Sequence, residues 1–282
     1  MAILEARNLC HIYGEGTPFE KVALNNVNFT IEQGEIVGIM GHTGSGKSSL
    51  ISHFNGLLKP SSGEILYHGK NIWEGNVRDV RFNVGLVFQY PEYQLFEETV
   101  ALDIAFGPKN MGLTQEEIDR RVDEAMAFVN LPLSLKEKSP FELSGGQKRR
   151  VAIAGVIAME PSVLILDEPT AGLDPVSRDE VLSHILHYHK DKNASIIFVT
   201  HSMEDLATTV DRIFVMNKGT PILNDTPAEI FEKSELLTEI GLSVPQITTV
   251  FKHLKDFGVD VDTDVYTVKY ATNLIKNMKG GF

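Results

Sequence analysis

Three short stretches of this sequence combine residue types that suit phosphate chemistry. The first is a glycine-rich loop, Gly41-His42-Thr43-Gly44-Ser45-Gly46-Lys47-Ser48. Its glycines let the backbone curl so that successive N–H groups point at phosphate oxygens, and the loop runs into the N-terminus of a helix. Lys47 can then reach the β- and γ-phosphates, and the Ser48 hydroxyl can ligate Mg²⁺. The turn and buried strand expected at 34–40 provide the structural context that this motif requires.

The second stretch is an apolar run, Val163–Leu166, that ends in two carboxylates, Asp167 and Glu168. Such a run suits a central parallel strand buried on both faces, and ligands bind at the carboxyl ends of such strands. We therefore expect Asp167 to hold Mg²⁺ through water and Glu168 to polarise the water that attacks a γ-phosphate. A purely structural alternative is that the two carboxylates cap the turn at Pro169-Thr170.

The third stretch, Leu143-Ser144-Gly145-Gly146-Gln147, has the Ser-x-x-Gln spacing of a helix capping box. The simplest interpretation is therefore an ordinary N-cap. An open helix N-terminus also attracts anions, and a cap alone does not require the paired glycines. Because this stretch is far from the phosphate loop along the chain, it would form a second half-site. The sequence thus predicts that two such chains meet around ATP.

Hydrophobic patterning indicates the elements that must position these groups. Alternation over residues 1–37 predicts antiparallel strands, and a helix follows the phosphate loop to about residue 58. From about 91 to 160 the pattern is helical, and Thr114 opens one of these helices with a capping box. Asp174-Pro175 begins another helix. Further strands are expected at 63–67, 84–88, 163–166, 195–200 and 212–216.

The chain changes character beyond Gly219. Capping-box spacing predicts short helices that start at Thr226–Glu229 and at Ser243–Gln246, and a last helix is expected over 271–278. No catalytic residue is identified in this tail, residues 226–282. Contact between subunits and passive packing both stay open as its role.

Taken in order, six features resemble the motifs of ATP-binding cassette ATPases. They are the phosphate loop, Gln89, the stretch 143–147, Asp167-Glu168, the loop Ala171–Asp174 and His201. The resemblance covers nearly all of residues 1–225. It implies an α/β fold with a RecA-like parallel-sheet nucleotide-binding core. An antiparallel β subdomain, a helical subdomain at about 91–160 and a small C-terminal helical extension would complete the chain.

The same resemblance assigns roles to single residues. Gln89 would ligate Mg²⁺ and link the ion and the attacking water to a membrane partner, and Asp174 would lie in the loop that crosses the dimer interface. His201 would contact the γ-phosphate and hold the water in line. Tyr13 matches the aromatic residue that stacks on adenine. Taken alone, however, a histidine before a helix-capping Ser202 is usually structural, and Tyr13 could equally be a packed strand aromatic.

Shorter stretches resemble one branch of this family, the ATPases of energy-coupling factor transporters, which take up vitamins and, in close relatives, cobalt or nickel. These stretches are Phe88–Val100, Ser144–Gly155, and Gly16–Lys21 with Ala23-Leu24. The last of them looks like the second of the two ATPase types in that branch. The resemblance implies an ATP hydrolase that uses ATP and Mg²⁺ to power micronutrient uptake from the cytoplasmic face of the cell membrane. Its partners would be a second cassette subunit, a membrane coupling protein and a substrate-binding membrane subunit.

Two other functions stay open. The ATPase of another cassette importer or exporter would differ only in its membrane partner. A soluble cassette ATPase of DNA repair or ribosome work usually has a core interrupted by long coiled coils, or two cassettes in one chain. Neither feature occurs in these 282 residues.

Composition sets limits on these functions. The formal net charge of −12 argues against nucleic acid as a partner. The single cysteine, Cys10, excludes an internal disulfide and suits a reducing cytoplasm. The first five residues lack the pattern of a signal peptide, and no uncharged apolar run approaches the roughly 18–20 residues that span a bilayer. His184, His187 and His189 lack a completing carboxylate or cysteine for a metal site, so we interpret them as solvated helix surface.

Large apolar side chains cluster just after Gln89, and acidic residues surround them. The apolar group is Tyr90, Tyr93, Leu95 and Phe96, and the acidic group is Glu92, Glu97 and Glu98. Because exposed apolar clusters mark interaction sites, we hypothesise that Tyr93 and Phe96 line a groove for a basic cytoplasmic helix of a membrane protein. The alternative is that these aromatics pack into the helical subdomain.

Overall fold

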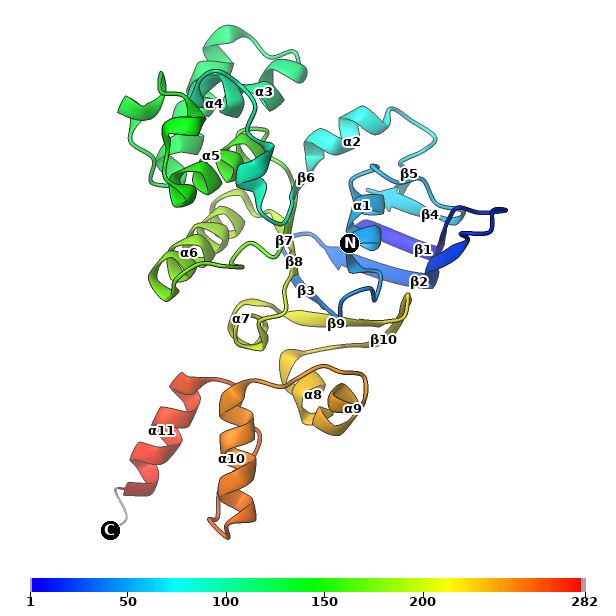
Figure 1. The fold of residues 1–282 in the computed structure, drawn as a ribbon, viewed down its shortest axis with the longest axis vertical. Coiled ribbons are helices and arrows are strands. Elements are labelled where there is room, and N and C mark those ends of the chain that lie inside the picture. Colours follow the sequence, from blue (N-terminus) through cyan, green and yellow to red (C-terminus); the bar gives the residue numbers. More distant parts are fainter. Residues whose placement is uncertain (1, 280–282) are drawn as a thin grey trace.

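A six-stranded sheet forms the centre of the computed structural model, which describes residues 2–279 (Figure 1). Its strand order is β10-β9-β3-β8-β7-β6, and all neighbours run parallel except β9 and β10, which form an antiparallel hairpin. Every residue of β3 and β8 is buried, because apolar cores lie on both faces of the sheet. The strands are β3 (Ile36–Met40), β6 (Val84–Val87), β7 (Val163–Asp167), β8 (Ser195–Val199), β9 (Arg212–Asn217) and β10 (Thr220–Asp225).

The register of the parallel strands brings the predicted functional groups to one edge of the sheet. Val87 pairs with Leu166, Leu166 with Phe198, and Ile39 with Val199. The segments that follow these four strands therefore begin side by side. They are the phosphate loop after β3, the glutamine after β6, the two carboxylates at the end of β7 and the histidine after β8. The predicted α/β core is confirmed.

A second sheet is antiparallel, as the alternation near the N-terminus predicted, and has the order β2-β1-β4-β5. Its strands are β1 (Ala2–Tyr13), β2 (Lys21–Glu32), β4 (Ser62–Tyr67) and β5 (Lys70–Asn71). Phe29 on β2 packs against Phe54 of helix α1 (Lys47–Phe54) and against Phe214 on β9, with ring centroids 4.9 and 5.1 Å apart. This apolar core holds α1, and with it the phosphate loop, between the two sheets.

His53 of α1 is fully buried in this region. Burial lowers the pKa of His53 from 6.5 to about 4; the bond to the Ser49 carbonyl opposes the shift, and the neighbouring His11 adds to it. A group whose pKa is depressed by folding binds its proton more readily in the unfolded chain. The stability that neutral His53 contributes is therefore complete above pH 6.5 and is lost as the pH falls toward 4.

We expect acidification from pH 7 to pH 5 to lower the free energy of unfolding, with His53 contributing at most about 2 kcal/mol. Urea titrations at the two pH values measure the difference. The variant His53→Asn cannot titrate there and should show a smaller loss than the wild type. His253→Asn, at an exposed histidine, is the matched control and should keep the wild-type loss. Equal losses for His53→Asn and the wild type would contradict this assignment.

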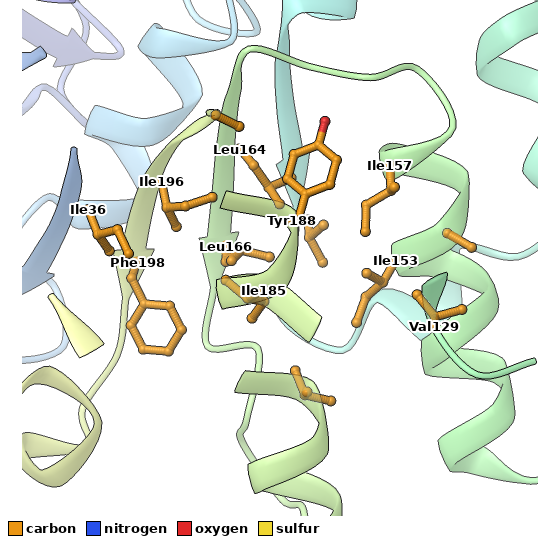
Figure 2. Packing of buried hydrophobic residues seen from close by; sticks show 14 of the residues in the cluster. Ile36, Val129, Ile153, Ile157, Leu164, Leu166, Ile185, Tyr188, Ile196 and Phe198 are labelled. Atoms are coloured by element: carbon orange, nitrogen blue, oxygen red, sulfur yellow. The ribbon is translucent and has the colours of Figure 1, made fainter. Parts of the chain in front are cut away.

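Helices cover the other face of the parallel sheet. Ile185 and Tyr188 of α6 (Pro175–Lys192) pack with Leu164 and Leu166 of β7, and the Ile153 side of α5 (Gly145–Ile157) closes the cluster (Figure 2). The helical subdomain expected at 91–160 is present. It contains the short helix η1 (Pro91–Gln94), α3 (Val100–Asn110), α4 (Gln115–Phe128), η2 (Leu133–Leu135), η3 (Pro140–Glu142) and α5, while α2 (Val77–Asn83) precedes it.

Two expected capping boxes differ from the structure. Thr114 caps α4, but Glu117 does not reach back to it, because that carboxylate binds Arg120 and Arg121 instead. The second box, expected at Ser243, is wrong. Helix α10 (Gln246–Asp256) begins after Pro245, and the side chain of Glu204, rather than that of Ser243, accepts the Gln246 N–H (3.1 Å).

The rest of the tail follows the expected pattern. Thr226 and Glu229 form the expected box at the start of α8 (Pro227–Glu232). The remaining helices are α7 (Met203–Thr209), α9 (Ser234–Glu239) and α11 (Val268–Lys279), the last beginning three residues before the expected 271. Phe251, Val265 and Ala271 form a small separate core where α10 and α11 meet, at the end of the molecule opposite the helical subdomain (Figure 1). No helix within residues 2–279 is both long and apolar enough to cross a membrane.

The expectation that the three histidines of α6 are solvated surface holds only for His187, which is exposed, whereas His184 and His189 are half-buried. His187 stacks on Phe128 with ring centroids 5.4 Å apart, and His184 contacts Asn130 through its Nε2. His189 Nδ1 lies 2.8 Å from the carbonyl oxygen of Ala194. The pKa of His184 is lowered by its partial burial. These side chains pack α6 against α4 and the start of β8, and no group of metal ligands occurs in the described part of the chain.

Candidate functional site

The phosphate loop has the curled backbone that the glycines predicted. Gly44 and Gly46 take φ of 81° and 102°, and a Cβ on Gly46 would lie 2.7 Å from the Ala23 carbonyl oxygen, so no larger residue fits there. Lys47 opens α1, and its Nζ donates to the carbonyl oxygens of Gly41 (2.6 Å) and His42 (3.2 Å). Burial lowers the pKa of Lys47, while the nearby Glu168 and Asp167 oppose that shift.

The turn between β9 and β10 supports this loop, a contact that the sequence patterns did not reveal. The Gly219 N–H donates to the carbonyl oxygen of Ser45 (2.9 Å), and Asn217 Oδ1 lies 3.0 Å from His42 Nε2. The turn residues lie about 170 positions beyond the loop, so no local pattern connects them. The only local sequence signal at this position is a short turn after an apolar strand. Such a turn is typical of a hairpin and does not indicate a contact with the phosphate loop.

The two carboxylates lie at the end of β7 and face the cavity. Asp167 has its pKa raised by burial and by the charge of Glu168. Glu168 is buried in a left-handed conformation with φ of 51°, and its N–H donates to the Val199 carbonyl oxygen (2.8 Å). Burial raises the pKa of Glu168, and its Oε1 has no hydrogen-bond partner in the described residues. The capping alternative is not supported, because Thr170 donates to Asp205 instead.

His201 follows β8 and lies beside the second carboxylate. Its Nε2 is 3.4 Å from Glu168 Oε1. Burial lowers the pKa of His201, and the charge of Lys47 acts in the same direction. The next residue, Ser202, caps α7 with its side chain, so the N-cap that the sequence suggested exists beside His201 and leaves the imidazole available to the cavity.

These groups surround a cavity of about 500 Å³, large enough for a nucleotide. Its lining includes Tyr13, Lys47, Ser48, Gln89, Asp167, Glu168 and His201. Three of the sequence-predicted loop residues are not in this lining, namely Gly41, His42 and Ser45. The lining also includes Lys21 and Lys218, two cations that the sequence reasoning missed. Neither the 143–147 stretch nor Asp174 contributes to the cavity in the part of the chain that is described.

The 143–147 stretch forms a capped and exposed helix N-terminus. Ser144 Oγ accepts the Gln147 N–H (3.3 Å), and Gln147 Oε1 accepts the Ser144 N–H (3.1 Å), so the expected capping box is present at the start of α5. Nothing lies within 4 Å of a Cβ placed on Gly145 or Gly146. Asp174 caps α6 with its carboxylate, which accepts the N–H groups of Val176 and Ser177 (3.1 Å each), and its hydrogen bonds from Ser177 lower its pKa.

Arg149 is a further residue of this region that sequence reasoning did not single out. Its guanidinium is buried and donates to the carbonyl oxygens of Ala171 (2.9 Å) and Glu168 (3.1 Å). It thereby ties α5 to the backbone segment that follows β7. Burial lowers the pKa of Arg149, an effect that the acidic Glu92 opposes.

A second hollow of about 420 Å³ lies between α2, α3 and α5. Phe96 lines it together with Phe106, and their rings meet edge to face with centroids 4.9 Å apart. Phe96 is 59% exposed and Tyr93 is 84% exposed, so neither side chain is buried in the helical subdomain. Tyr93 lies beside the hollow rather than in its lining, and Leu95 is the member of the cluster that joins the core.

The chain matches the ABC transporter family over residues 24–171. The energy-coupling factor transporter ATP-binding protein EcfA2 of Clostridium perfringens is 55% identical over 271 residues, which cover 95% of each chain. The protein of the same name from Caldanaerobacter subterraneus subsp. tengcongensis is 54% identical over 98% of each chain. This chain belongs to the energy-coupling factor ATPases.

Solved structures agree with that family. The structure of cbiO1 from Clostridium perfringens, described as part of the ABC transporter complex cbiONQ, is 42% identical, with a TM-score of 0.74 over 89% of this chain and 99% of that one. The ATP-binding cassette MJ0796, a dimer bound to ADP and Pi, is 26% identical, with a TM-score of 0.71 over 79% of this chain and 98% of that one. As an energy-coupling factor ATPase, the chain is an ATP hydrolase coupled to transport.

Proposed function

We propose that this energy-coupling factor ATPase binds ATP with Mg²⁺ and hydrolyses it, together with a second cassette subunit, to power uptake of a micronutrient, a vitamin or a transition metal ion. One observation carries the proposal. Lys47, Asp167 and Glu168 converge with His201 on one cavity, while the helix N-terminus at 143–147 lies outside it. The site therefore has every group for one nucleotide except a cover for its γ-phosphate.

The chain's own residues divide the chemistry among themselves. The loop amides and Lys47 hold the β- and γ-phosphates. The unpaired Oε1 of Glu168 accepts a proton of the attacking water and polarises it. His201, 3.4 Å from that oxygen, orients the water toward the γ-phosphate. The backbone bonds of Glu168 fix the carboxylate before substrate arrives.

Ser48 and Asp167 suit a magnesium site. A hydrogen bond from the Ser48 hydroxyl moderates the raised pKa of the Asp167 carboxyl, and Gln89 lines the same cavity. Hydroxyl, carboxylate and amide oxygens are ligands that Mg²⁺ accepts alongside water and phosphate. When bound, the ion neutralises charge on the phosphates. Asp167 and Glu168 lie side by side, and each has a raised pKa. A bound cation would relieve the unfavourable interaction between their negative charges.

The second subunit would supply the missing cover. The exposed N-terminus of α5 has open space over its paired glycines, and a neighbouring γ-phosphate could occupy it. In this arrangement Ser144 to Gln147 of each chain bind the nucleotide of the other, and Asp174 lies near the interface. The subunits close when ATP bridges them and open after hydrolysis.

The membrane partners would bind at the hollow lined by Phe96. Residues 1–225 form the ATPase and 226–282 an extension in this proposal. The hollow lined by Phe96 receives a cytoplasmic helix of the coupling protein, which holds the ATPase at the inner face of the membrane with a substrate-binding membrane subunit. The formal net charge of −12 favours basic partner surfaces over nucleic acid.

Copurification from gently solubilised membranes tests this function. We expect the tagged chain to retain a second cassette protein and small integral membrane proteins, and the complex to hydrolyse ATP. Recovery with ordinary importer or exporter subunits would favour that class of transporter instead. Recovery only from the soluble fraction, with DNA-repair or ribosomal factors, would overturn the assignment to transport.

A double replacement of Tyr93 and Phe96 with Ser tests the docking surface. Because both side chains are more than half exposed, the isolated chain should fold and bind ATP normally. Loss of the apolar contact should reduce membrane assembly and transport by at least about tenfold. Phe257→Ser, at another highly exposed aromatic on the C-terminal tail, is the control. Unfolding of the isolated double variant would make these residues core, and normal assembly would put the contact elsewhere.

A further inference from the structure

A closed ring of contacts among four residues, Tyr13, Ser49, His53 and His11, joins β1 to α1. His11 and Tyr13, two apart on β1, share one face of the strand. Ser49 and His53, four apart on α1, share one face of the helix. The chemistry described above uses only Tyr13 of these four.

Each member contacts the next. Tyr13 OH lies 3.1 Å from Ser49 Oγ, and His53 Nδ1 lies 2.6 Å from the Ser49 carbonyl oxygen. His53 Nε2 lies 3.2 Å from His11 Nδ1. The ring closes where His11 meets Tyr13 edge to face, with ring centroids 4.5 Å apart and planes at 84°.

The hydrogen bonds assign the tautomers of the two histidines. A carbonyl oxygen only accepts, so Nδ1 of His53 carries the hydrogen that it donates to Ser49. With a pKa of about 4, His53 is neutral at pH 7, and its Nε2 accepts from Nδ1–H of His11. For a neutral His11 this leaves Nε2 as a buried acceptor, which indeed has no partner in the described residues. A buried acceptor without a partner is costly, so the pair is not explained by stability alone.

The ring holds Tyr13 at two points. His11 packs against the aromatic ring, and Ser49 binds the hydroxyl, although Tyr13 itself is 43% exposed toward the cavity. Ser49 is the residue directly after Ser48 and two after Lys47. The contacts therefore set the distance between the aromatic face and the phosphate-binding groups before a ligand arrives, which reduces the entropy lost on binding.

We propose that His11, Ser49 and His53 are positioning residues for the nucleobase. They hold the Tyr13 ring in place before a nucleotide binds. The fixed distance between this ring and the phosphate loop favours binding of a triphosphate that carries a planar base over binding of a triphosphate alone. This inference rests on the proposed function, because it takes Tyr13 as the surface on which the base stacks.

The test compares the dissociation constants of the full chain for ATP and for inorganic tripolyphosphate, both with Mg²⁺. Ser49→Ala removes the hydroxyl contact, and His11→Asn keeps a donor near the Nδ1 position but removes the ring against Tyr13. Each should weaken ATP binding about five- to tenfold and tripolyphosphate binding less than twofold. His11→Phe, which keeps the ring contact, should lie closer to the wild type than His11→Asn. Ser52→Ala, one turn after Ser49 on the same helix, is the control and should change neither constant.

A double-mutant cycle avoids dependence on buried substitutions. Tyr13→Phe and Ser49→Ala each remove one end of the same contact, so the double variant should lose no more ATP affinity than either single variant. Additive losses would overturn the inference. So would equal weakening of ATP and tripolyphosphate by His11→Asn, because that is the result of a merely structural contact.

The variant Tyr13→Ala distinguishes a failure of this inference from a failure of the proposed nucleotide-binding function. If Tyr13→Ala leaves the ratio of the two dissociation constants unchanged, the base does not stack on Tyr13 and the proposed nucleotide orientation is wrong. If Tyr13→Ala lowers the preference for ATP while Ser49→Ala and His11→Asn do not, the platform exists but the ring does not position it.

Discussion

Replacing Glu168 with Gln is expected to slow ATP hydrolysis by about 10²- to 10⁴-fold while leaving ATP binding intact. Gln has nearly the same shape, so the packing around the buried side chain and its backbone bonds to Val199 and Arg149 should persist. What disappears is the basic carboxylate beside His201, because an amide oxygen can accept a hydrogen bond from water but cannot take its proton. In the proposed cycle, closure requires ATP and opening requires hydrolysis, so the variant should accumulate as a closed dimer.

Two measurements on the same preparation test this prediction. Phosphate release gives the rate of hydrolysis, and the dimer fraction in the presence of ATP gives the extent of closure. Glu116→Gln, at an exposed carboxylate of α4, should behave as the wild type. Turnover near the wild-type rate in Glu168→Gln would remove this residue from the catalytic role. Lost ATP binding would instead indicate a damaged site.

Ser144→Arg should have the second large effect, abolishing closure and reducing hydrolysis to the level of an isolated subunit. An arginine at the N-cap of α5 would project into the open space that the paired glycines leave for a neighbouring nucleotide. Because Ser144 lies outside the chain's own cavity, ATP binding by the monomer should be unchanged. Lys47→Ala should have the opposite pattern, with nucleotide binding lost in its own subunit.

The capping role of Ser144 must be separated from this effect. Ser144→Ala removes the cap, which typically costs about 1 kcal/mol, without adding bulk or charge. It should therefore lower the melting temperature slightly but allow closure to a much greater extent than Ser144→Arg. If Ser144→Arg abolished ATP binding by an isolated monomer, the arrangement with two shared half-sites would be wrong.

The sequence predicted the site best where function depends on adjacent residues. The phosphate loop and the run ending in Glu168 each carry their own context, so strand, turn and ligand groups could be placed without knowledge of the fold. Parallel pairing then accounts for why Gln89 and His201 reach the same edge. The capping box at Ser144 was visible for the same reason, since its partners are three residues apart.

Contacts between distant segments could not be predicted in this way. The role of Arg149 could not be predicted, because the carbonyl groups that bind it lie about 20 residues further on. The bond between His11 and His53 spans 42 residues. The expected cap at Ser243 failed because matching residue types do not ensure that the chain enters a helix there, and Pro245 starts α10 instead. The docking hypothesis placed Phe96 correctly in a hollow, whereas Tyr93 lies beside it.

The backbone at Glu168 carries a consequence for how this ATPase can vary. A left-handed conformation in a residue with a side chain costs on the order of 1 kcal/mol or more, and here it coincides with a buried carboxylate whose pKa is raised. Asparagine and glycine adopt that conformation more readily and would remove the buried charge. Substitutions of Glu168 by these residues are therefore expected to stabilise the fold while they abolish hydrolysis. Selection for heat resistance alone would replace the glutamate. A glutamate is therefore retained at this position only where ATP must be hydrolysed. A thermostable member of this family that lacks it would be a subunit that does not hydrolyse ATP.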